Sequence, residues 1–285
     1  MMKVIKTITA LQEEIKAYKQ ANKTIGLVTT MGALHEGHAS LIKAASEEND
    51  VAVVSVFVNP TQFGPTEDLD SYPRTLDADC RLAEGMGADV VFAPTPQEMY
   101  PSADMTWVEV TGNITKVLCG ATRPIHFRGV ATVVAKFFNL VQPDKAYFGQ
   151  KDAQQVQVLQ RMVRDLFFPL ELRVMPIIRE ADGLAKSSRN TYLSAAERQS
   201  ALILSQSLRA VQDSFAQGER TTAKLLEQVT NQIKTEPMAV IDYVSLYQLP
   251  DLTECPAQLS GRSLLAVAVK FGNTRLIDNV ILEDK

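Results

Sequence analysis

Apolar runs that suit buried strands alternate with helical segments through the first half of the chain. Several runs are apolar at successive positions, which is typical of parallel strands covered on both faces. The predicted strands are Ile25–Thr29, Val51–Val58, Asp89–Ala93, Lys145–Phe148 and Leu170–Ile177. The predicted helices are Leu11–Lys19, Gly37–Glu48, Asp77–Gly85, Val130–Val141 and Ala153–Phe167, the first with a capping box at Thr9 and Gln12. This alternation predicts an α/β fold with a Rossmann-like, doubly wound parallel sheet and right-handed crossovers.

The pattern changes after Asp182 and Gly183. Two long amphipathic segments, Ser194–Phe215 and Thr221–Lys234, predict helices, and the apolar runs after them predict short strands. These strands are Ile241–Gln248, Ser263–Phe271 and Arg275–Leu282. Helices followed by strands are typical of an α+β module. We therefore predict a Rossmann-like nucleotide-binding domain at residues 1–182 and a smaller α+β C-terminal domain at residues 183–285.

The charge balance limits the classes of partner. The chain carries a formal net charge of −4, which argues against broad binding to nucleic acid or to an anionic membrane, because both require a strongly basic face. Its apolar runs are shorter than the about 18 residues that a membrane-spanning helix needs, and its start lacks the apolar core of a secretory signal. Its three widely spaced cysteines fit a reducing compartment and argue against structural zinc. We expect a cytoplasmic protein without nucleic-acid or membrane partners.

The segment "TTMGALHEGH", residues 29–38, places two of the three histidines just after the first predicted strand. In an open α/β sheet, the loop after a strand feeds a helix whose free N–H groups attract anions. Gly32 and Gly37 allow the backbone to approach a phosphate closely, and His35 and His38 can donate N–H bonds to it. Two alternatives remain. The histidines could bind a metal, although the H-E-x-x-H spacing is absent, or they could cap the helix or pack in the core.

Two later segments supply further groups for a polyphosphate. In "YFGQKDAQQ", residues 147–155, Gly149 permits close approach, Lys151 is a point charge, and Asp152 is a candidate N-cap or acceptor for a nucleotide hydroxyl. In "ADGLAKSSRN", residues 181–190, two cations and two hydroxyls lie together, which suits a triphosphate or a departing pyrophosphate. Taken alone, each segment is more typical of a solvated loop. Combined with the two histidines, they favour an ATP site.

H-x-G-H after a first strand and a basic, hydroxyl-rich loop after a later one are typical of nucleotidyltransferases and class I aminoacyl-tRNA synthetases. Within that superfamily, the sequence closely resembles the pantothenate synthetase (pantoate–β-alanine ligase) family. The matching segments extend from residue 29 to residue 282 and read "TTMGALHEGH", "VVSVFVNPTQFGPTEDLDSYPRT", "RPIHFRGVATVVAKFFNLVQPDKAYFGQKDAQQ", "READGLAKSSRNTYLS" and "RLIDNVIL".

The resemblance implies a cytoplasmic homodimer that condenses (R)-pantoate with β-alanine through a pantoyl-adenylate intermediate, giving pantothenate, AMP and diphosphate. ATP is the co-substrate, and Mg²⁺ is expected to be carried mainly by the ATP phosphates, without protein metal ligands. His38 matches the family's proton donor, and His35, Lys151 and Arg189 are the other catalytic candidates. The ATP-site candidates are Met31, Gly32, Ala33, Leu34, His35, Glu36, Gly37, His38, Gly149, Gln150, Lys151, Asp152, Ile178, Lys186, Ser187, Ser188 and Arg189.

The substrate-binding candidates are mostly neutral. Gln62 and Gln155 match the family's pantoate-binding positions, with Gln62 also near β-alanine, and paired amides can both donate to and accept from a small hydroxy acid. Asn59, before Pro60, is expected either to orient this pocket or to form a turn. In "RPIHFRG", Arg123 and His126 are candidate substrate-side groups, with a surface salt bridge as the alternative for the arginine.

Two positions depart from the family pattern. Thr29 stands where the family usually has proline, and Gln150 stands where a glutamate is frequent, so we give Gln150 a backbone role only. Both departures concern affinity more than the type of reaction.

Two other functions stay open: another small-molecule adenylyltransferase of the same superfamily, and a non-catalytic adenine-nucleotide sensor. A flexible Gly183 would let the C-terminal domain act as a lid.

Overall fold

The chain folds into two compact units. The structure is a computed structural model that describes residues 2–65 and 67–284. The first unit is formed by Met1–Thr111, Arg123–Gln150 and Val158–Pro176, and the second by Gly112–Thr122, Lys151–Gln157 and Ile177–Lys285. None of the described helices is long and apolar enough to cross a membrane.

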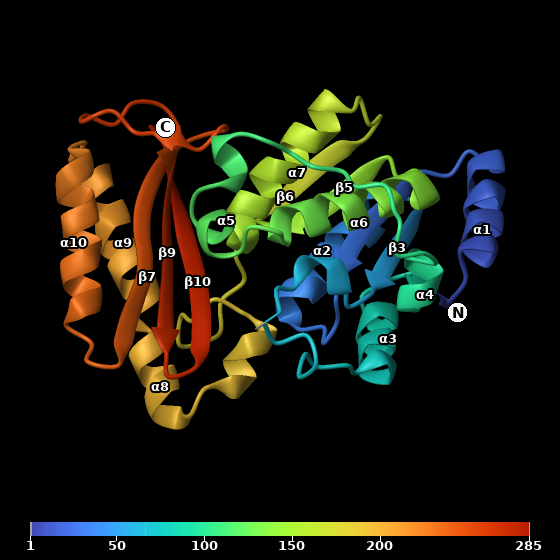
Figure 1. The fold of residues 1–285 in the computed structure, drawn as a ribbon, viewed down its shortest axis with the longest axis horizontal. Helices are drawn as coiled ribbons and strands as arrows, with labels where there is room; N and C mark the ends of the chain where they lie inside the picture. Colours follow the sequence, from blue (N-terminus) through green and yellow to red (C-terminus); the bar gives the residue numbers. More distant parts are fainter. Residues whose placement is uncertain (1, 66, 285) are drawn as a thin grey trace. The chain divides into compact units, whose positions relative to one another are not determined.

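The first unit is built on a six-stranded sheet (Figure 1). Its strands are β1 (Lys3–Ile5), β2 (Ile25–Thr30), β3 (Val51–Val56), β4 (Val90–Phe92), β5 (Lys145–Gly149) and β6 (Glu171–Met175). They are ordered β1-β4-β3-β2-β5-β6, and every neighbouring pair is parallel. The predicted doubly wound parallel sheet is therefore confirmed.

Helices cover both faces of this sheet. They are α1 (Ile8–Gln20), α2 (Glu36–Glu48), α3 (Leu76–Gly85), α4 (Pro96–Met99), α6 (His126–Val141) and α7 (Ala153–Asp165). On one face, α2 and α3 pack on Val28, Val54 and Val91, all of which are fully buried. On the other, Phe137 of α6 meets the ring of Phe92 edge-on, with 6.2 Å between ring centroids. Strand residues thus alternate between two apolar layers, which explains why the strands are apolar at successive positions.

The strand order reverses between β2 and β5. From β2 the chain crosses to β3 and then β4 on one side, whereas from β5 it crosses to β6 on the other. Ligands of doubly wound sheets bind beyond the carboxyl ends of the strands at such a switch point. The residues that follow β2 and β5 are therefore the first candidates for a ligand site.

Two local predictions need correction, and one strand was missed. The first helix begins at Ile8 and is capped by Thr7, whose side chain accepts from the Ala10 N–H, so the predicted capping box at Thr9 and Gln12 is wrong. The strand β1 was not predicted, because its Lys-Val-Ile run is mostly exposed and lacks the successive buried apolar residues of β4, which is equally short. The long helix predicted at Ser194–Phe215 is two helices, α8 (Ala195–Ala201) and α9 (Ile203–Ala216), separated at Leu202.

The second unit has α+β architecture. Its helices are α5 (Cys119–Thr122), α8, α9 and α10 (Thr222–Lys234), and its strands are β7 (Ala239–Gln248), β8 (Thr253–Glu254), β9 (Ser263–Phe271) and β10 (Thr274–Leu282). The strands form an antiparallel sheet in the order β10-β9-β7-β8. Buried residues of α9 and α10, such as Leu208 and Val229, pack against Leu265 and Val267 of β9. The predicted α+β module is confirmed, with β8 as an added strand.

Candidate functional site

The loop after β2 leads into α2 through a reciprocal cap made by two histidines. His35 is the N-cap residue, and its Nδ1 accepts from the Gly37 N–H at 3.1 Å. In return, the His35 N–H donates to Nδ1 of His38 at 3.3 Å. The two rings lie 4.1 Å apart between centroids, tilted by 32°. The motif therefore satisfies backbone donors that the first turn of a helix otherwise leaves unpaired.

This cap fixes the tautomer of both rings. A nitrogen that accepts a hydrogen bond carries no proton, so a neutral ring must carry its proton on Nε2. Each histidine can then cap the helix with one nitrogen and offer an N–H donor with the other. Helix capping was one of the alternatives left open by the sequence, and this geometry makes it compatible with binding a phosphate. Among the described residues, no group of three His, Cys, Asp or Glu could hold a metal ion.

The turn before the histidines is held by several backbone contacts. Gly32 has a φ of +75°, in the left-handed region that favours glycine. Its N–H donates to Oγ1 of Thr30 at 3.3 Å, and its carbonyl accepts from the Tyr72 hydroxyl at 3.3 Å. Two residues on, the Leu34 N–H donates to Oδ1 of Asp79 at 2.7 Å. The shape of the loop is thus supported by contacts with other groups of the chain.

Asp79 was not singled out from the sequence. It lies in the first turn of α3, is 2% exposed, and also accepts from the Thr75 hydroxyl at 3.0 Å. A Cβ built on Gly32 would lie 2.6 Å from its Oδ2, so the carboxylate and the glycine are matched to each other. An acidic residue in a first helical turn usually serves the helix dipole, and only the fold reveals the contact with Leu34.

The carboxyl group of Asp79 gives a pH-dependent prediction. Its burial raises its pKa above the ordinary range, against the opposing effect of the hydrogen bonds from Leu34 and Thr75, and its Oδ2 has no hydrogen-bond partner. A raised folded-state pKa means that the neutral form favours folding and that this contribution is lost as the pH rises. The stability of Asp79→Asn relative to wild type is therefore expected to be greater at pH 7.5 than at pH 4.5. Urea unfolding at both pH values measures the difference in free energy of unfolding between the variant and wild type. A difference that is the same at both pH values, or larger at pH 4.5, would contradict the prediction.

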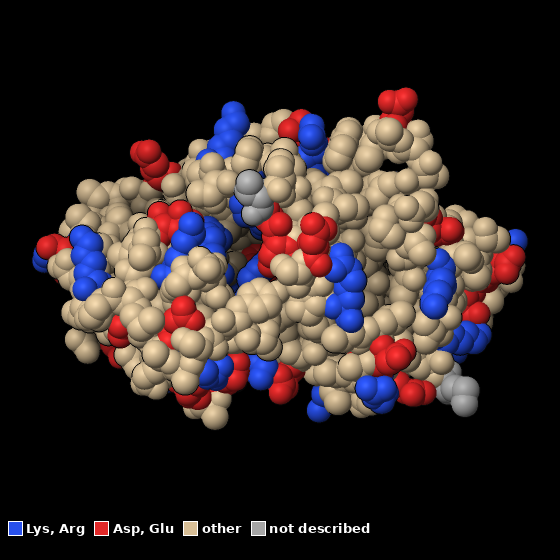
Figure 2. Space-filling model, turned by 60° about the horizontal axis from the view of Figure 1, so that its bottom comes forward, with Lys and Arg blue, Asp and Glu red and all other residues tan. Residues whose placement is uncertain are grey.

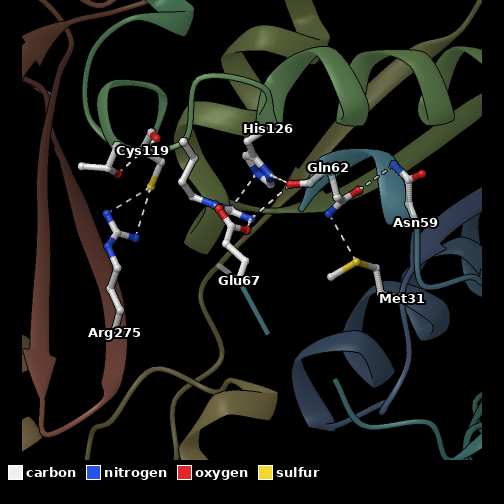
Figure 3. Close-up of polar contacts among 9 residues, drawn as sticks. Met31, Asn59, Gln62, Glu67, Cys119, His126 and Arg275 are labelled. Carbon is white, nitrogen blue, oxygen red and sulfur yellow. Dashed lines mark hydrogen bonds and ion pairs between the residues drawn. The ribbon is translucent and has the colours of Figure 1, made fainter. Parts of the chain in front are cut away.

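The carboxyl end of β3 positions Gln62. The 3₁₀ turn η1 (Pro60–Gln62) is capped by Asn59, whose Oδ1 accepts from the Thr61 N–H at 3.3 Å. The Asn59 amide also donates to Oε1 of Gln62 at 3.1 Å, and the Gln62 amide donates to the sulfur of Met31 at 3.2 Å (Figure 3). Asn59 therefore forms the turn that the sequence left as one alternative, and it also contacts the Gln62 side chain, whereas its role in orienting a substrate pocket stays a prediction. Met31 and Gln62, from different loops, lie side by side.

Helix α6 packs directly on this turn because Gly129 has no side chain. A Cβ built there would lie 2.5 Å from the Thr61 carbonyl oxygen and 2.6 Å from Cα of Gln62. The Gly129 carbonyl also accepts from the Asn59 amide at 3.2 Å. Sequence reasoning missed this glycine, because a glycine inside a helical pattern gives no sign of what it touches.

Arg123 and His126 contact the main chain of the same turn. His126 Nδ1 lies 3.1 Å and Arg123 Nη2 3.4 Å from the Gln62 carbonyl oxygen. Arg123 also forms a two-pronged ion pair with Glu67, with nitrogen–oxygen distances of 2.5 and 2.9 Å. The salt bridge that the sequence left as an alternative for Arg123 is therefore present. It connects Glu67 to the arginine that also contacts the Gln62 carbonyl.

The carboxyl end of β5 carries the next candidates. Gly149 ends the strand, and a Cβ built on it would find nothing within 4 Å, so the backbone there is open to a ligand. Lys151 and Asp152 follow in a 3₁₀ turn, their charges 3.9 Å apart, and the Lys151 carbonyl accepts from the Asn279 amide at 2.9 Å. Gln155 lies in the first turn of α7 and is partly exposed.

The basic, hydroxyl-rich segment lies in the second unit. Ser187 caps the 3₁₀ turn η4 (Ser188–Tyr192) by accepting from the Arg189 N–H at 3.3 Å. The Lys186 N–H donates to the Ile178 carbonyl at 2.9 Å, so these two ATP-site candidates are backbone neighbours. The Lys186 ammonium lies 3.7 Å from Glu180, which also pairs with Arg198. Arg179 and Ala185 form an antiparallel bridge, so the segment continues a short hairpin, and Glu180 connects it to Arg198.

Comparison with known proteins decides the family. The family model for pantoate–β-alanine ligase matches residues 3–281. The chain belongs to the pantoate–β-alanine ligase family. It is 55% identical to the pantothenate synthetase of Acetivibrio thermocellus over 282 residues, which are 99% of this chain and 100% of that protein. It is 54% identical to the pantothenate synthetase of Moorella thermoacetica, with 99% of each chain covered.

Solved structures of this ligase family match the fold. A pantothenate synthetase from Thermus thermophilus superposes with a TM-score of 0.94 at 42% identity, covering 99% of this chain and 100% of that one. A pantoate–β-alanine ligase from Francisella tularensis, described as complexed with β-γ ATP and β-alanine, matches with a TM-score of 0.81 at 34% identity over 100% of this chain and 99% of that one. As a family member with this fold, the chain is an enzyme of the ligase class.

Proposed function

We propose that this ligase condenses (R)-pantoate with β-alanine in two steps at the carboxyl ends of β2, β3 and β5. ATP first transfers its adenylyl group to pantoate, and β-alanine then displaces AMP from the pantoyl adenylate to give pantothenate. Family membership and the nucleotide-bound relative from Francisella tularensis support the overall reaction. The observation that carries the assignment to this site is the histidine pair at the start of α2, whose Nδ1 atoms cap the helix.

The nucleotide site begins at this histidine pair. The residues at 31–38 combine a loop supported by other groups of the chain, a helix N-terminus and two Nε2–H donors, which together suit the phosphates of ATP. On the face shown in Figure 2, lysine and arginine side chains are interspersed with aspartate and glutamate, so specific local donors matter more than a general basic surface. The other proposed nucleotide contacts are Gly149, Gln150, Lys151, Asp152, Ile178, Lys186, Ser187, Ser188 and Arg189.

In the first step, a carboxylate oxygen of pantoate attacks the α-phosphorus of ATP, and the bond to the departing pyrophosphate breaks. Negative charge builds on the α-phosphate oxygens and on the leaving group, so positioned donors and cations lower the barrier. A unit charge at about 4 Å is worth roughly 4 kcal/mol at an effective dielectric near 20. We assign His35, His38 and Lys151 to the α-phosphate, and residues 186–189 to the pyrophosphate.

Mg²⁺ enters this proposal with ATP. The described residues offer no cluster of three acidic or imidazole ligands, and Mg²⁺ is commonly held by substrate phosphates with few protein ligands. The ion would neutralise charge on the triphosphate. We assign the chain's own residues to orienting the nucleotide.

The pantoate subsite is built around Gln62 and Gln155. Asn59 holds Oε1 of Gln62, and one N–H of the Gln62 amide donates to the Met31 sulfur, so its second N–H is the donor that we assign to a pantoate oxygen. A neutral amide suits a substrate whose carboxylate must remain nucleophilic, because a close cation would stabilise its charge. Arg123 and His126 complete the proposed substrate side.

In the second step, the β-alanine amine attacks the carbonyl carbon of the acyl adenylate and AMP leaves. Water competes with this amine, so the site must be closed during the step. We propose that residues 183–285 act as the lid and that the working form is a cytoplasmic homodimer. Small-angle scattering with and without ATP tests the lid, and light scattering tests the dimer; an unchanged profile or a monomer mass would remove the corresponding proposal.

Mass-spectrometric product analysis separates this function from its two alternatives. With ATP, pantoate and β-alanine together, we expect pantothenate, AMP and pyrophosphate in equal amounts, and no pantothenate when any one is omitted. Another adenylyltransferase would release pyrophosphate and keep a nucleotide-bearing product whether or not β-alanine is present. A nucleotide sensor would bind ATP without turnover. Either of these results would overturn the proposed function.

A further inference from the structure

We propose that Glu67 is a positioning residue of the ligase reaction, which acts through Arg123 and His126 to hold Gln62 in place for pantoate. This inference rests on the proposed function of Gln62. It gives Arg123 and His126 a role in shaping the pantoate subsite rather than in direct contact with a substrate carboxylate. Figure 3 shows Glu67 and His126 beside Gln62.

The guanidinium group of Arg123 contacts both Gln62 and Glu67. Arg123 Nε and Nη2 bind the Glu67 carboxylate at 2.9 and 2.5 Å, and Nη2 also approaches the Gln62 carbonyl at 3.4 Å. The ion pair is partly buried, with 20% of the arginine and 23% of the glutamate side chain exposed. Burial alone would raise the pKa of Glu67, but the hydrogen bond and charge of Arg123 hold that pKa below its usual range. The pair is therefore intact at neutral pH, and its two-pronged geometry fixes direction as well as distance.

His126 adds a second donor to the same carbonyl. Arg123 Nη1 can only donate, so His126 Nε2, 3.2 Å away, must accept, and the neutral ring carries its proton on Nδ1. That Nδ1–H then donates to the Gln62 carbonyl at 3.1 Å. His126 is 9% exposed, and its ring packs edge-on against Phe127. The ion pair thus sets the tautomer of His126 as well as the position of Arg123.

Gln62 is held at both its main chain and its side chain. Its carbonyl is contacted by Arg123, just before α6, and by His126 at the start of α6, and its side-chain amide is held by Asn59. The absence of a side chain at Gly129 lets α6 approach closely enough for these contacts. If Glu67 releases Arg123, the carbonyl contacts loosen first, and the amide that faces pantoate moves with them. Small displacements of positioning groups can cost about 10²-fold in rate.

The variants Glu67→Ala, Glu67→Gln, Arg123→Ala and the double variant Glu67→Ala/Arg123→Ala test this role. We expect Glu67→Ala to lower kcat/KM for pantoate about 10- to 100-fold, with KM for ATP within about twofold of wild type, and Glu67→Gln to recover part of the loss by keeping an acceptor for Arg123. Because the two residues act as one unit, the double variant should be no worse than the more damaged single variant. Glu47→Ala, which removes the exposed ion pair with Lys43, is the matched control and should leave all constants unchanged.

The outcomes are distinguishable. Unchanged kcat/KM for pantoate in both Glu67 variants would overturn the inference, as would equal losses for pantoate and ATP accompanied by a lower melting temperature, which would indicate a general loss of folding. A third result would also overturn the inference. If Arg123→Ala raises only the KM for β-alanine and Glu67→Ala changes no kinetic constant, Arg123 is a direct substrate ligand. If the wild-type chain neither binds pantoate nor makes pantothenate, the proposed function fails, and this inference fails with it.

Discussion

His38→Asn is expected to lower kcat for pantoyl-adenylate formation by about 10²- to 10⁴-fold, the range typical of losing a general acid. His38 has two roles in this proposal. Its Nδ1 accepts from the His35 N–H, and its Nε2–H is the proposed donor to the reacting phosphate. An asparagine Oδ1 lies near the place of Nδ1, so this variant can keep the helix cap. It has nothing at the place of Nε2. The expected result is a folded enzyme with a damaged reaction.

His38→Gln is the matched counterpart. A glutamine at N3 of a helix can accept from the N-cap N–H, as in a capping box, so the cap of α2 can be kept. Its longer side chain also brings a polar amide closer to the place of Nε2 than asparagine does. We expect this variant to keep more activity than His38→Asn at a similar thermal stability. Pyrophosphate exchange into ATP measures the chemistry, and thermal unfolding measures the cap. Activity losses that simply follow the losses in stability would show that His38 serves only to cap α2.

Lys151→Met is expected to lower kcat by about 10²–10³-fold, comparable to the loss of one donor to a developing oxyanion. Methionine keeps most of the length of the chain and removes the charge. The backbone of Lys151 is anchored by Asn279, and its side chain is 21% exposed, so the position of the residue does not depend on its charge. The loss should therefore appear in kcat with little change in stability.

Lys145→Met is the control for this variant. Lys145 is the first residue of β5, whereas Lys151 follows the last residue of that strand. The Lys145 ammonium pairs with Glu48 at 3.3 Å, at the end of β5 opposite to the proposed site. Single-turnover kinetics with ATP and pantoate should leave this control within about twofold of wild type, because a partly exposed ion pair is worth little. A Lys151→Met enzyme as active as the control would remove Lys151 from the catalytic groups.

Periodicity was sufficient to predict the sheet. Strands β2 to β6 are each covered on both faces or bounded by a helix of clear 3.6-residue period, so their existence and parallel direction could be inferred from local patterns, whereas their order in the sheet was not predicted. The edge strand β1 was missed because it is mostly exposed and begins with a lysine, and β8 was missed because two residues are too few to show a period. The break at Leu202 was also missed, since the apolar spacing continues through it.

The candidate site was predictable only where its residues share a local motif. The loop at residues 31–38 brings its glycines and histidines together by chain connection, so its place after β2 followed from the sequence. Asp79 reaches Leu34 across 45 positions, and Arg123 reaches Glu67 across 56. Such contacts depend on how α3 and α6 pack on the sheet, and no local pattern reports that packing. Asp79, Glu67 and Gly129 were therefore missed, although the loops that they contact were found.

The route through a pantoyl adenylate is tested most directly by following the carboxylate oxygens of pantoate. In the proposed first step one of these oxygens bonds to the α-phosphorus, and in the second step it leaves with AMP. With ¹⁸O in both carboxylate positions of pantoate, we expect one ¹⁸O in each AMP and one in each pantothenate, as read by mass spectrometry. Label in free phosphate together with ADP, or AMP without any label, would contradict it.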